Sequence, residues 1–284
     1  MKNIIVRSIS GAVYVALIVC AIIFGEIWMF SALCSAFAIL GVAELHHLCR
    51  SESGAKTALA PLDMAGAFIL VAAPSAIMIY ASSGGPSVIA VTASALCAYL
   101  VYFIARLVCQ LYLPAENAIA ATSAGLMGQL YVALPLCCAS LLYLACGPWI
   151  VLTMFIMIWL NDTGAFCVGS LFGRHRLFER ISPKKSWEGF FGGLIFSILG
   201  GVIIKLTFGA MSPGYSTLQM CALGAVVSIF ATWGDLVESL FKRTANVKDS
   251  GHIMPGHGGI LDRIDSLLLV APAVVCFVTI LIIV

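Results

Sequence analysis

A polar stretch near the C-terminal end, residues 239–265, holds much of what this chain offers for chemistry. Only 10% of the 284 residues are charged. The stretch nevertheless contains Lys242, Arg243, Lys248, Asp249, Asp262, Arg263 and Asp265. Three glycines surround His257, and glycines let backbone N–H groups approach a ligand closely. This combination predicts a site for phosphate groups and for a metal ion.

Two pairs of carboxylates lie at the two ends of this stretch. Asp235 and Glu238 are three residues apart and share one helix face, and Asp262 and Asp265 repeat that spacing. Antiparallel helices would bring the two pairs together, where carboxylate oxygens suit a hard cation such as Mg²⁺. The alternative is a structural salt-bridge network, since Lys242 lies four residues after Glu238. That pair alone leaves Asp235 without a partner nearby in the sequence. We predict Asp235 and Asp262 as metal ligands, supported by Glu238 and Asp265.

Two further polar groups lie upstream. In the segment 182–189, Lys184 and Lys185 precede an expected helix start, an arrangement suited to phosphate. The alternative is that these lysines only fix the orientation of the chain in a membrane. Asn161 and Asp162 lie inside an apolar run, where an aspartate costs about 2.5–3.5 kcal/mol unless it is paired or hydrated. Asp162 is therefore either part of a polar clamp between helices or a wall of a hydrated cavity.

The composition shows what must position these residues. The chain is 62% hydrophobic with a mean hydropathy of +1.08, against roughly 45–50% apolar residues in soluble domains. Its apolar runs have the length of membrane helices rather than of barrel strands. We predict an all-α, polytopic integral membrane protein. The nine expected spans are 8–24, 27–46, 59–81, 87–110, 118–145, 148–172, 189–209, 217–240 and 265–284. The net charge of the chain is +2, which gives no reason to expect a nucleic-acid partner.

The basic residues predict the orientation. With nine crossings, all of them except Lys205 fall on one side, which by the positive-inside rule is the cytoplasm. They are Lys2, Arg7, Arg50, Lys56, Arg106, Arg174, Arg176, Arg180, Lys184, Lys185, Lys242, Arg243, Lys248 and Arg263. The N-terminus is then cytoplasmic and the C-terminus outside. We expect N-terminal membrane helices over 1–146, about five spans, and a catalytic membrane region over 147–284.

The second half of the chain, roughly 150–270, resembles the phosphatidate cytidylyltransferase family, also called CDP-diacylglycerol synthase. The segment 182–189 is similar to that family's Ser-Pro-Lys-Lys-Thr-Trp-Glu-Gly, with Ser186 in place of the commoner threonine. Asn161-Asp162 and Gly234-Asp235 also fit the family pattern. The main signature is matched by Ser239, Lys242-Arg243, Lys248-Asp249, His257-Gly258-Gly259 and Asp262-Arg263-Ile264-Asp265.

The resemblance implies the reaction CTP + phosphatidate → CDP-diacylglycerol + pyrophosphate, an early step of phospholipid biosynthesis. It implies Mg²⁺, with a second monovalent or divalent cation as an option, and a homodimer in the cytoplasmic membrane of a bacterium. A lipid phosphate must meet a soluble nucleotide, so we expect the site at the cytoplasmic border of the bilayer and direct displacement at the α-phosphorus. The expected catalytic residues are Asp235, Asp262, Lys242 and Arg263. The expected substrate-binding residues are Asn161, Asp162, Ser182, Lys184, Lys185, Ser239, Arg243, Lys248, Asp249, His257, Gly258 and Gly259.

Other classes of membrane protein fit the sequence less well. A transporter would also have many spans and intramembrane acids, but the two halves show no inverted repeat and the charges lie at the border rather than the midplane. A CDP-alcohol phosphotransferase would need the string D-G-x-x-A-R with later aspartates four apart, and the chain lacks it. Another CTP-dependent lipid phosphotransferase or kinase remains an alternative.

Overall fold

The computed structural model describes residues 2–53, 57–82, 87–113, 117–209, 214–251, 253 and 258–283, without the side chains of 2–8, 50–53, 57 and 82. The elements are α1 (Lys2–Ile23), α2 (Glu26–Ser53), η1 (Thr57–Leu59), α3 (Ala60–Ser82), α4 (Val88–Tyr112), α5 (Ala118–Met127), the π-helical segment η2 (Gly128–Ala133), α6 (Leu134–Cys146), α7 (Pro148–Phe172), β1 (Arg176–Phe178), β2 (Ser182–Ser186), α8 (Trp187–Thr207), α9 (Thr217–Thr244) and α10 (Leu261–Ile283).

The prediction of a polytopic helical membrane protein is confirmed. Within the described residues, eight helical stretches are long and apolar enough to cross a membrane, with α5, η2 and α6 forming one of them. The apolar part of α1, Ile9–Ile23, is shorter. The segment before α8 contains an antiparallel hairpin, in which β1 pairs with β2, and it leads into the helix start expected there.

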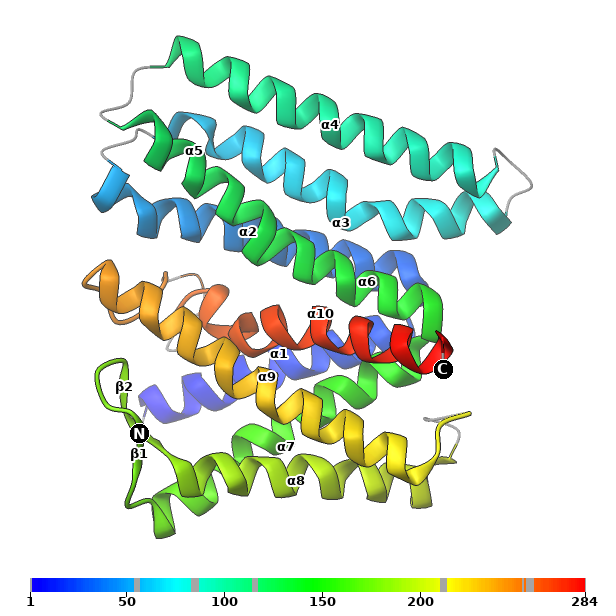
Figure 1. Ribbon diagram of the computed structural model, residues 1–284, viewed down its shortest axis with the longest axis vertical. Coiled ribbons are helices and arrows are strands. Elements are labelled where there is room, and N and C mark those ends of the chain that lie inside the picture. The colour runs from blue at the N-terminus through cyan, green and yellow to red at the C-terminus, as the bar shows by residue number, and fades with distance from the viewer. Residues whose placement is uncertain are drawn as a thin grey trace.

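The helices form two groups that meet along α1 and α10 (Figure 1). Helices α2 to α6 pack together on one side, with α4 at the edge, and α7, α8 and α9 pack on the other. Helices α9 and α10 are antiparallel neighbours, as the expected meeting of the acidic pairs requires. Helix α1 begins at the end of the bundle that carries the hairpin, and α10 ends at the opposite end.

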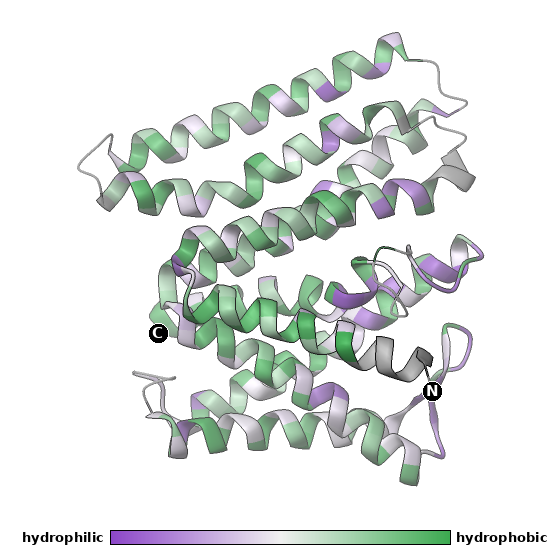
Figure 2. Ribbon diagram, turned by 180° about the vertical axis from the view of Figure 1, so that it is seen from behind, coloured by the Kyte–Doolittle hydropathy of each residue, from purple (hydrophilic) through white to green (hydrophobic). Residues whose placement is uncertain are grey.

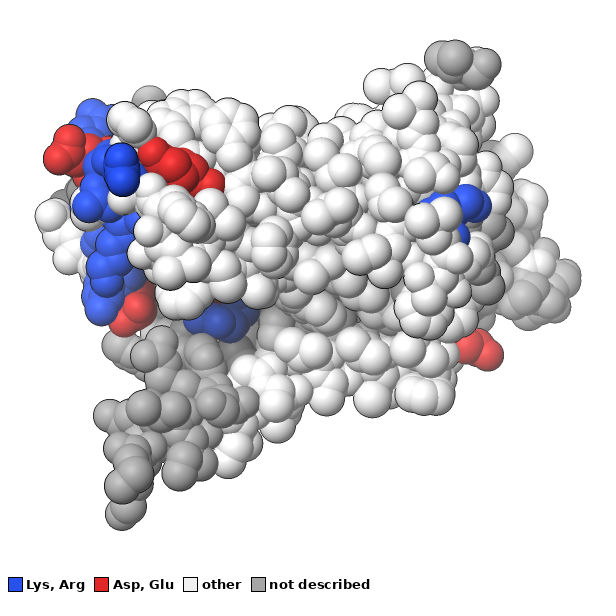
Figure 3. Space-filling model, turned by 90° about the horizontal axis from the view of Figure 1, so that it is seen from below, with Lys and Arg blue, Asp and Glu red and all other residues white. Residues whose placement is uncertain are grey.

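The surface is divided as a membrane protein requires. Hydrophilic residues gather mostly at the hairpin end of the bundle (Figure 2), and Lys and Arg gather at that end in the view from below (Figure 3). Large apolar side chains are exposed along the helices, for example Ile89, Val101 and Ile104 of α4. This pattern agrees with the prediction that most basic residues lie on one side of the membrane. Which side faces the cytoplasm stays a prediction. Arg106, counted from the sequence among the flanking charges, is instead buried in the bundle.

Small residues let the helices of the second group approach closely at polar positions. A Cβ at Gly234 of α9 would lie 2.5 Å from the carbonyl oxygen of Asp265 in α10. A Cβ at Gly193 of α8 would lie 2.5 Å from Asn161 Oδ1 in α7. Since association in lipid depends on van der Waals packing, such positions favour glycine. The close approaches bring the polar residues of neighbouring helices within reach of one another.

A buried polar cluster joins the helices of the first group. Asp63 of α3 is fully buried and accepts hydrogen bonds from Arg106 Nε at 3.0 Å and from the Tyr102 hydroxyl at 2.8 Å, both from α4. His46 Nε2 of α2 lies 2.9 Å from the same carboxylate. The Gln129 amide donates to the Asp63 backbone carbonyl at 2.7 Å, from η2. Asp63 thus connects four helical segments, α2, α3 and α4 through its carboxylate and η2 through its backbone carbonyl.

We expect Asp63→Asn to destabilise the protein by roughly 3–5 kcal/mol, because it leaves the buried Arg106 guanidinium without its anionic partner. The measurement is thermal unfolding of the purified protein in detergent. The control is Glu179→Gln, which removes an exposed carboxylate from the hairpin. An unfolding temperature equal to that of the control would contradict a structural role for the pair.

Candidate active site

Two cavities lie side by side at the hairpin end of the second helical group. The first, which we call the hairpin cavity, has a volume of about 460 Å³ and lies between α7, β2, α8 and α9. The second, the inner cavity, has about 340 Å³ and lies between α1, α7, α9 and α10. Asp162 and Asp235 line both cavities, so they form the wall that the cavities share. Asp162 therefore lies where its interpretation as a cavity wall places it, and its role there stays a prediction.

The hairpin cavity combines cations with apolar walls. Lys184 and Lys185 line it from β2, while Phe166 of α7 and Phe190 of α8 line it from the helices. Lys185 Nζ forms an ion pair with Asp235 Oδ2 at 2.7 Å. Asp235 therefore has its charge partner 50 positions earlier in the chain, which the sequence did not indicate.

Glu188, in the first turn of α8, holds the hairpin in position. The Glu188 carboxylate accepts hydrogen bonds from the backbone N–H groups of Arg174 and His175, at 3.1 and 3.2 Å. His175 Nδ1 lies 2.6 Å from the same carboxylate. Ser186 caps α8 by accepting a hydrogen bond from the Gly189 N–H at 3.1 Å. These contacts fix β2, and with it both lysines, against the start of α8.

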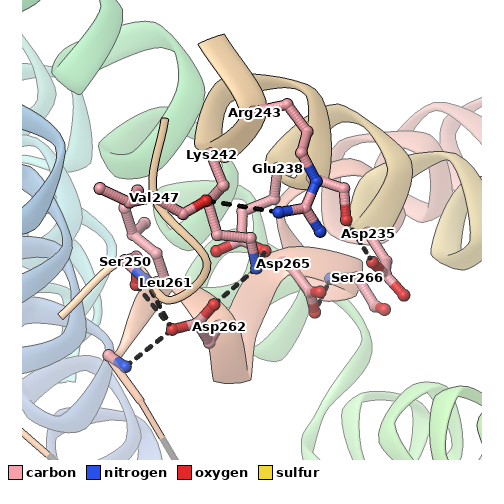
Figure 4. Close-up of polar contacts among 12 residues, drawn as sticks. Asp235, Glu238, Lys242, Arg243, Val247, Ser250, Leu261, Asp262, Asp265 and Ser266 are labelled. Atoms are coloured by element: carbon pink, nitrogen blue, oxygen red, sulfur yellow. Dashed lines mark hydrogen bonds and ion pairs between the residues drawn. The ribbon is translucent and has the colours of Figure 1, made fainter. Parts of the chain in front are cut away.

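Lys242 of α9 joins the two acidic pairs (Figure 4). Its Nζ lies 2.5 Å from Glu238 Oε2 and 2.6 Å from Asp262 Oδ1 of α10. The pairing of Lys242 with Glu238, which the sequence offers as the alternative, is therefore present. Lys242 contacts Asp262 as well, so the pair is part of a larger network. Glu238 is 1% exposed, so its charge depends on this lysine. Asp235 meanwhile accepts a hydrogen bond from the Ser239 hydroxyl at 3.2 Å, one turn further along α9.

The other oxygen of Asp262 holds the glycine-rich loop. Asp262 Oδ2 accepts hydrogen bonds from the backbone N–H groups of Ser250 and Gly259, at 2.9 and 2.8 Å, and lies 3.0 Å from the Ser250 hydroxyl. Gly258 has φ +86°, and a Cβ there would lie 2.5 Å from the same oxygen. Both the positive φ and the lack of room for a Cβ atom therefore require glycine at position 258. Asp262 thus orders the loop at one end while contacting Lys242 at the other.

The remaining predicted residues that the structure describes fall into three groups. Asp265 and Arg263 line the inner cavity with Asp162 and Asp235. Asn161 lines the hairpin cavity and accepts a hydrogen bond from the Ser228 hydroxyl at 2.7 Å, so it also clamps α7 to α9. Outside the linings of both cavities, Ser182 lies in β2, Lys248 and Asp249 are exposed on the loop, and Arg243 donates to the Ile181 carbonyl at 3.4 Å. His257 lies outside the described residues.

The acids of the site suit a cation, although they do not form a finished ligand set. Among the described residues, no three His, Cys, Asp or Glu side chains converge as ligands of one metal ion do. The two cavities and the Lys242 bridge contain five carboxylates, Asp162, Asp235, Glu238, Asp262 and Asp265, and four basic side chains, Lys184, Lys185, Lys242 and Arg263. The excess of acids lies in the inner cavity, where four carboxylates line the wall together with Arg263. Carboxylate oxygens are the ligands that Mg²⁺ prefers.

Sequence reasoning missed several residues that build the site. They include Glu188, Ser228 and Ser250, to which the sequence by itself assigns no role. Glu44 of α2 was missed as well, although it accepts hydrogen bonds from the backbone N–H groups of Ile260 and Leu261, both at 2.9 Å. A signal for Glu44 existed, because a lone acid inside an apolar run requires an explanation, as Asp162 did.

The chain is similar in sequence to known bacterial proteins. A protein named phosphatidate cytidylyltransferase from Staphylococcus epidermidis is 48% identical over 122 residues, which are 43% of this chain and 46% of that protein. Proteins of the same name from Staphylococcus haemolyticus and Staphylococcus aureus are 48% and 47% identical over 126 residues, 44% of this chain and 47% of each relative. In each case the match spans about half the length of the relative. The model of the cytidylyltransferase family matches residues 5–281. This chain therefore belongs to the cytidylyltransferase family.

Proposed function

We propose that this protein is a phosphatidate cytidylyltransferase, which converts CTP and phosphatidate to CDP-diacylglycerol and pyrophosphate. The observation that carries the proposal is the pair of cavities that meet at Asp162 and Asp235. Two anionic substrates that must react with each other need separate pockets with one common wall. The names of the relatives support the same reaction.

The hairpin cavity suits the lipid substrate. Phe166, which lines it, is 75% exposed on the side of α7, so the cavity reaches an apolar surface that acyl chains could follow. Lys184 and Lys185 would meet the phosphate of phosphatidate, a headgroup that carries between one and two negative charges near pH 7. Lysine binds phosphate as a point charge.

The inner cavity suits the nucleotide. Its acidic lining repels a bare triphosphate, whereas a triphosphate that carries a divalent cation fits both the acids and Arg263. Asp235 and Asp262, both in its lining, would hold Mg²⁺ there, with Asp265 and Asp162 of the same lining and Glu238, which contacts Lys242, in support. The cation would neutralise charge on the phosphates. The loop that carries Gly258 and Gly259 would offer N–H groups to the nucleotide, and the proposal keeps His257 in that role.

The chemical step is direct displacement. An oxygen of the phosphatidate phosphate forms a bond to the α-phosphorus of CTP while the bond from that phosphorus to the β-phosphate bridging oxygen breaks, and pyrophosphate leaves. The nucleophile is already ionised near pH 7, so no enzyme nucleophile is required. The protein supplies position and charge compensation, which dominate phosphoryl-type transfers. Lys185 and Lys242, each fixed by ion pairs, would keep positive charge beside the reacting phosphates.

The setting of the reaction follows from the surface. The protein is a multi-pass membrane protein with bacterial relatives, and we propose the cytoplasmic membrane, with the basic hairpin end facing the cytoplasm. CTP is available on that side. A homodimer is proposed from family resemblance alone.

Purified protein given CTP, phosphatidate and Mg²⁺ should release CDP-lipid and pyrophosphate in equal amounts, and EDTA should abolish both. Labelled pyrophosphate should not exchange into CTP when the lipid is absent, because direct displacement forms no nucleotidyl-enzyme. A phosphorylated lipid product would instead indicate a lipid kinase. Absence of any product from folded protein would contradict the proposal.

We expect Asp235→Asn to lower kcat/KM by about 100-fold or more, which corresponds to about 2.7 kcal/mol of transition-state stabilisation. The change removes a charge from the common wall and weakens the contact with Lys185. The measurement is CDP-lipid formation by detergent-purified protein that elutes like wild type. Glu179→Gln, in the exposed part of the hairpin, should retain full activity. Retention of more than about a tenth of wild-type activity by Asp235→Asn would contradict the assignment.

The double change of Lys184 and Lys185 to Gln should reduce kcat/KM for phosphatidate by about tenfold or more, since a hydrogen bond to a charged group contributes about 1.5–3 kcal/mol. The matched control changes Arg174 and Arg180 of the same hairpin to Gln, which removes the same charge from outside the cavity lining. Equal kinetics in both double variants would favour the alternative in which these lysines serve only as orientation signals.

A further inference from the structure

A single carboxylate from the first helical group holds the loop of the candidate site. Glu44 of α2 is 6% exposed, and its partners lie more than 200 positions away in the sequence. Glu44 Oε1 accepts a hydrogen bond from the Ile260 N–H, and Oε2 accepts one from the Leu261 N–H, both at 2.9 Å. The Ser250 hydroxyl lies 3.0 Å from Oε2. Glu44 thus binds the last residue before α10, the first residue of α10 and the preceding loop together.

These contacts are specific to a carboxylate. All three donors are neutral, and two of them are N–H groups at the N-terminus of α10, where a helix lacks internal acceptors and favours a negative charge. Both oxygens of Glu44 are needed as acceptors. Glutamine would present one oxygen and an NH₂ group, which cannot accept a hydrogen bond.

Glu44 is connected to the acidic site through Ser250. The Ser250 hydroxyl lies 3.0 Å from both Glu44 Oε2 and Asp262 Oδ2, so it can donate to either carboxylate. Asp262 contacts Lys242, which contacts Glu238. A continuous polar chain therefore runs from α2 through the loop to α9. The space around it is tight, because a Cβ at Gly251 would lie 2.5 Å from Glu44 Oε1.

We infer that Glu44 is a positioning residue for the cytidylyl transfer, and that α2 fixes through it the loop and the start of α10 where the nucleotide binds. Glu44 lines neither cavity, so it acts through Asp262 and the glycine N–H groups rather than on a substrate. The inference gives the first helical group a part in the reaction. Its kinetic consequence rests on the proposed function, whereas the structural restraint does not.

The test compares Glu44→Gln with Glu26→Gln, which changes the exposed acid at the opposite end of the same helix. Hydrogen exchange should be at least about tenfold faster at the Ile260 and Leu261 amides in Glu44→Gln, with unchanged exchange in α4 and in the control. In the transfer assay, KM for CTP should rise about tenfold and kcat should fall, while KM for phosphatidate changes less than twofold. A loss of stability alone would lower the fraction of active enzyme, but it would not raise KM for CTP more than KM for phosphatidate.

Gly251→Ala provides a second approach from the loop side. Its added methyl group would displace the Glu44 carboxylate, so it should reproduce the exchange pattern and the rise in KM for CTP. Unchanged exchange at Ile260 and Leu261 in both variants would overturn the inference, as would equal increases in KM for the two substrates. If wild-type protein forms no CDP-lipid, the proposed function fails, and the exchange measurement still decides whether Glu44 restrains the loop.

Discussion

Charge compensation inside an apolar bundle is the constraint on which this structure depends. A carboxylate removed from water costs several kcal/mol unless a cation or hydrogen-bond donors compensate it. The acids at the hairpin end illustrate several such solutions. Glu238 and Asp262 share Lys242, Asp235 is paired with Lys185, and Glu44 accepts hydrogen bonds from neutral donors alone. Because each solution joins two or more segments, compensating the charges also assembles the site.

Among the residues that the structure describes, compensation is incomplete at the wall between the two cavities. Asp162, Asp235 and Asp265 line the inner cavity beside Arg263, and their charges exceed those of the nearby basic side chains. Carboxylates at short range in a medium of reduced dielectric repel each other strongly. The arrangement therefore favours a bound cation, and with it an anionic ligand. A fully neutralised network would be more stable in isolation but would have no excess charge left to attract the cation and the nucleotide that we propose.

The division of labour between the helical groups follows from the same contacts. Helices α7 to α10 carry the cavities, while α2 to α6 provide a rigid support in which Asp63 joins four helical segments. Helix α2 belongs to both systems, since His46 contacts Asp63 and Glu44 contacts the start of α10. Helix α1 closes the inner cavity, where the Tyr14 hydroxyl donates to the Arg263 carbonyl at 3.0 Å. The N-terminal half is thus a structural support for the loop rather than only a membrane anchor.

The sequence alone determined the class of fold and the identity of most polar residues near the cavities. Hydropathy fixed the helices because bilayer thickness sets their length, and the spacing of Asp235, Glu238, Asp262 and Asp265 placed them at one end of an antiparallel pair. Only the tertiary structure decided the partners. Lys185 reaches Asp235 because Glu188 pins the hairpin, and Lys242 reaches Asp262 because glycine at position 234 lets α9 approach α10. Glu44 meets Ile260 and Leu261 across more than 200 residues. Such pairings depend on which helix faces pack together, and in a chain that is apolar on almost every face, periodicity carries little information about packing.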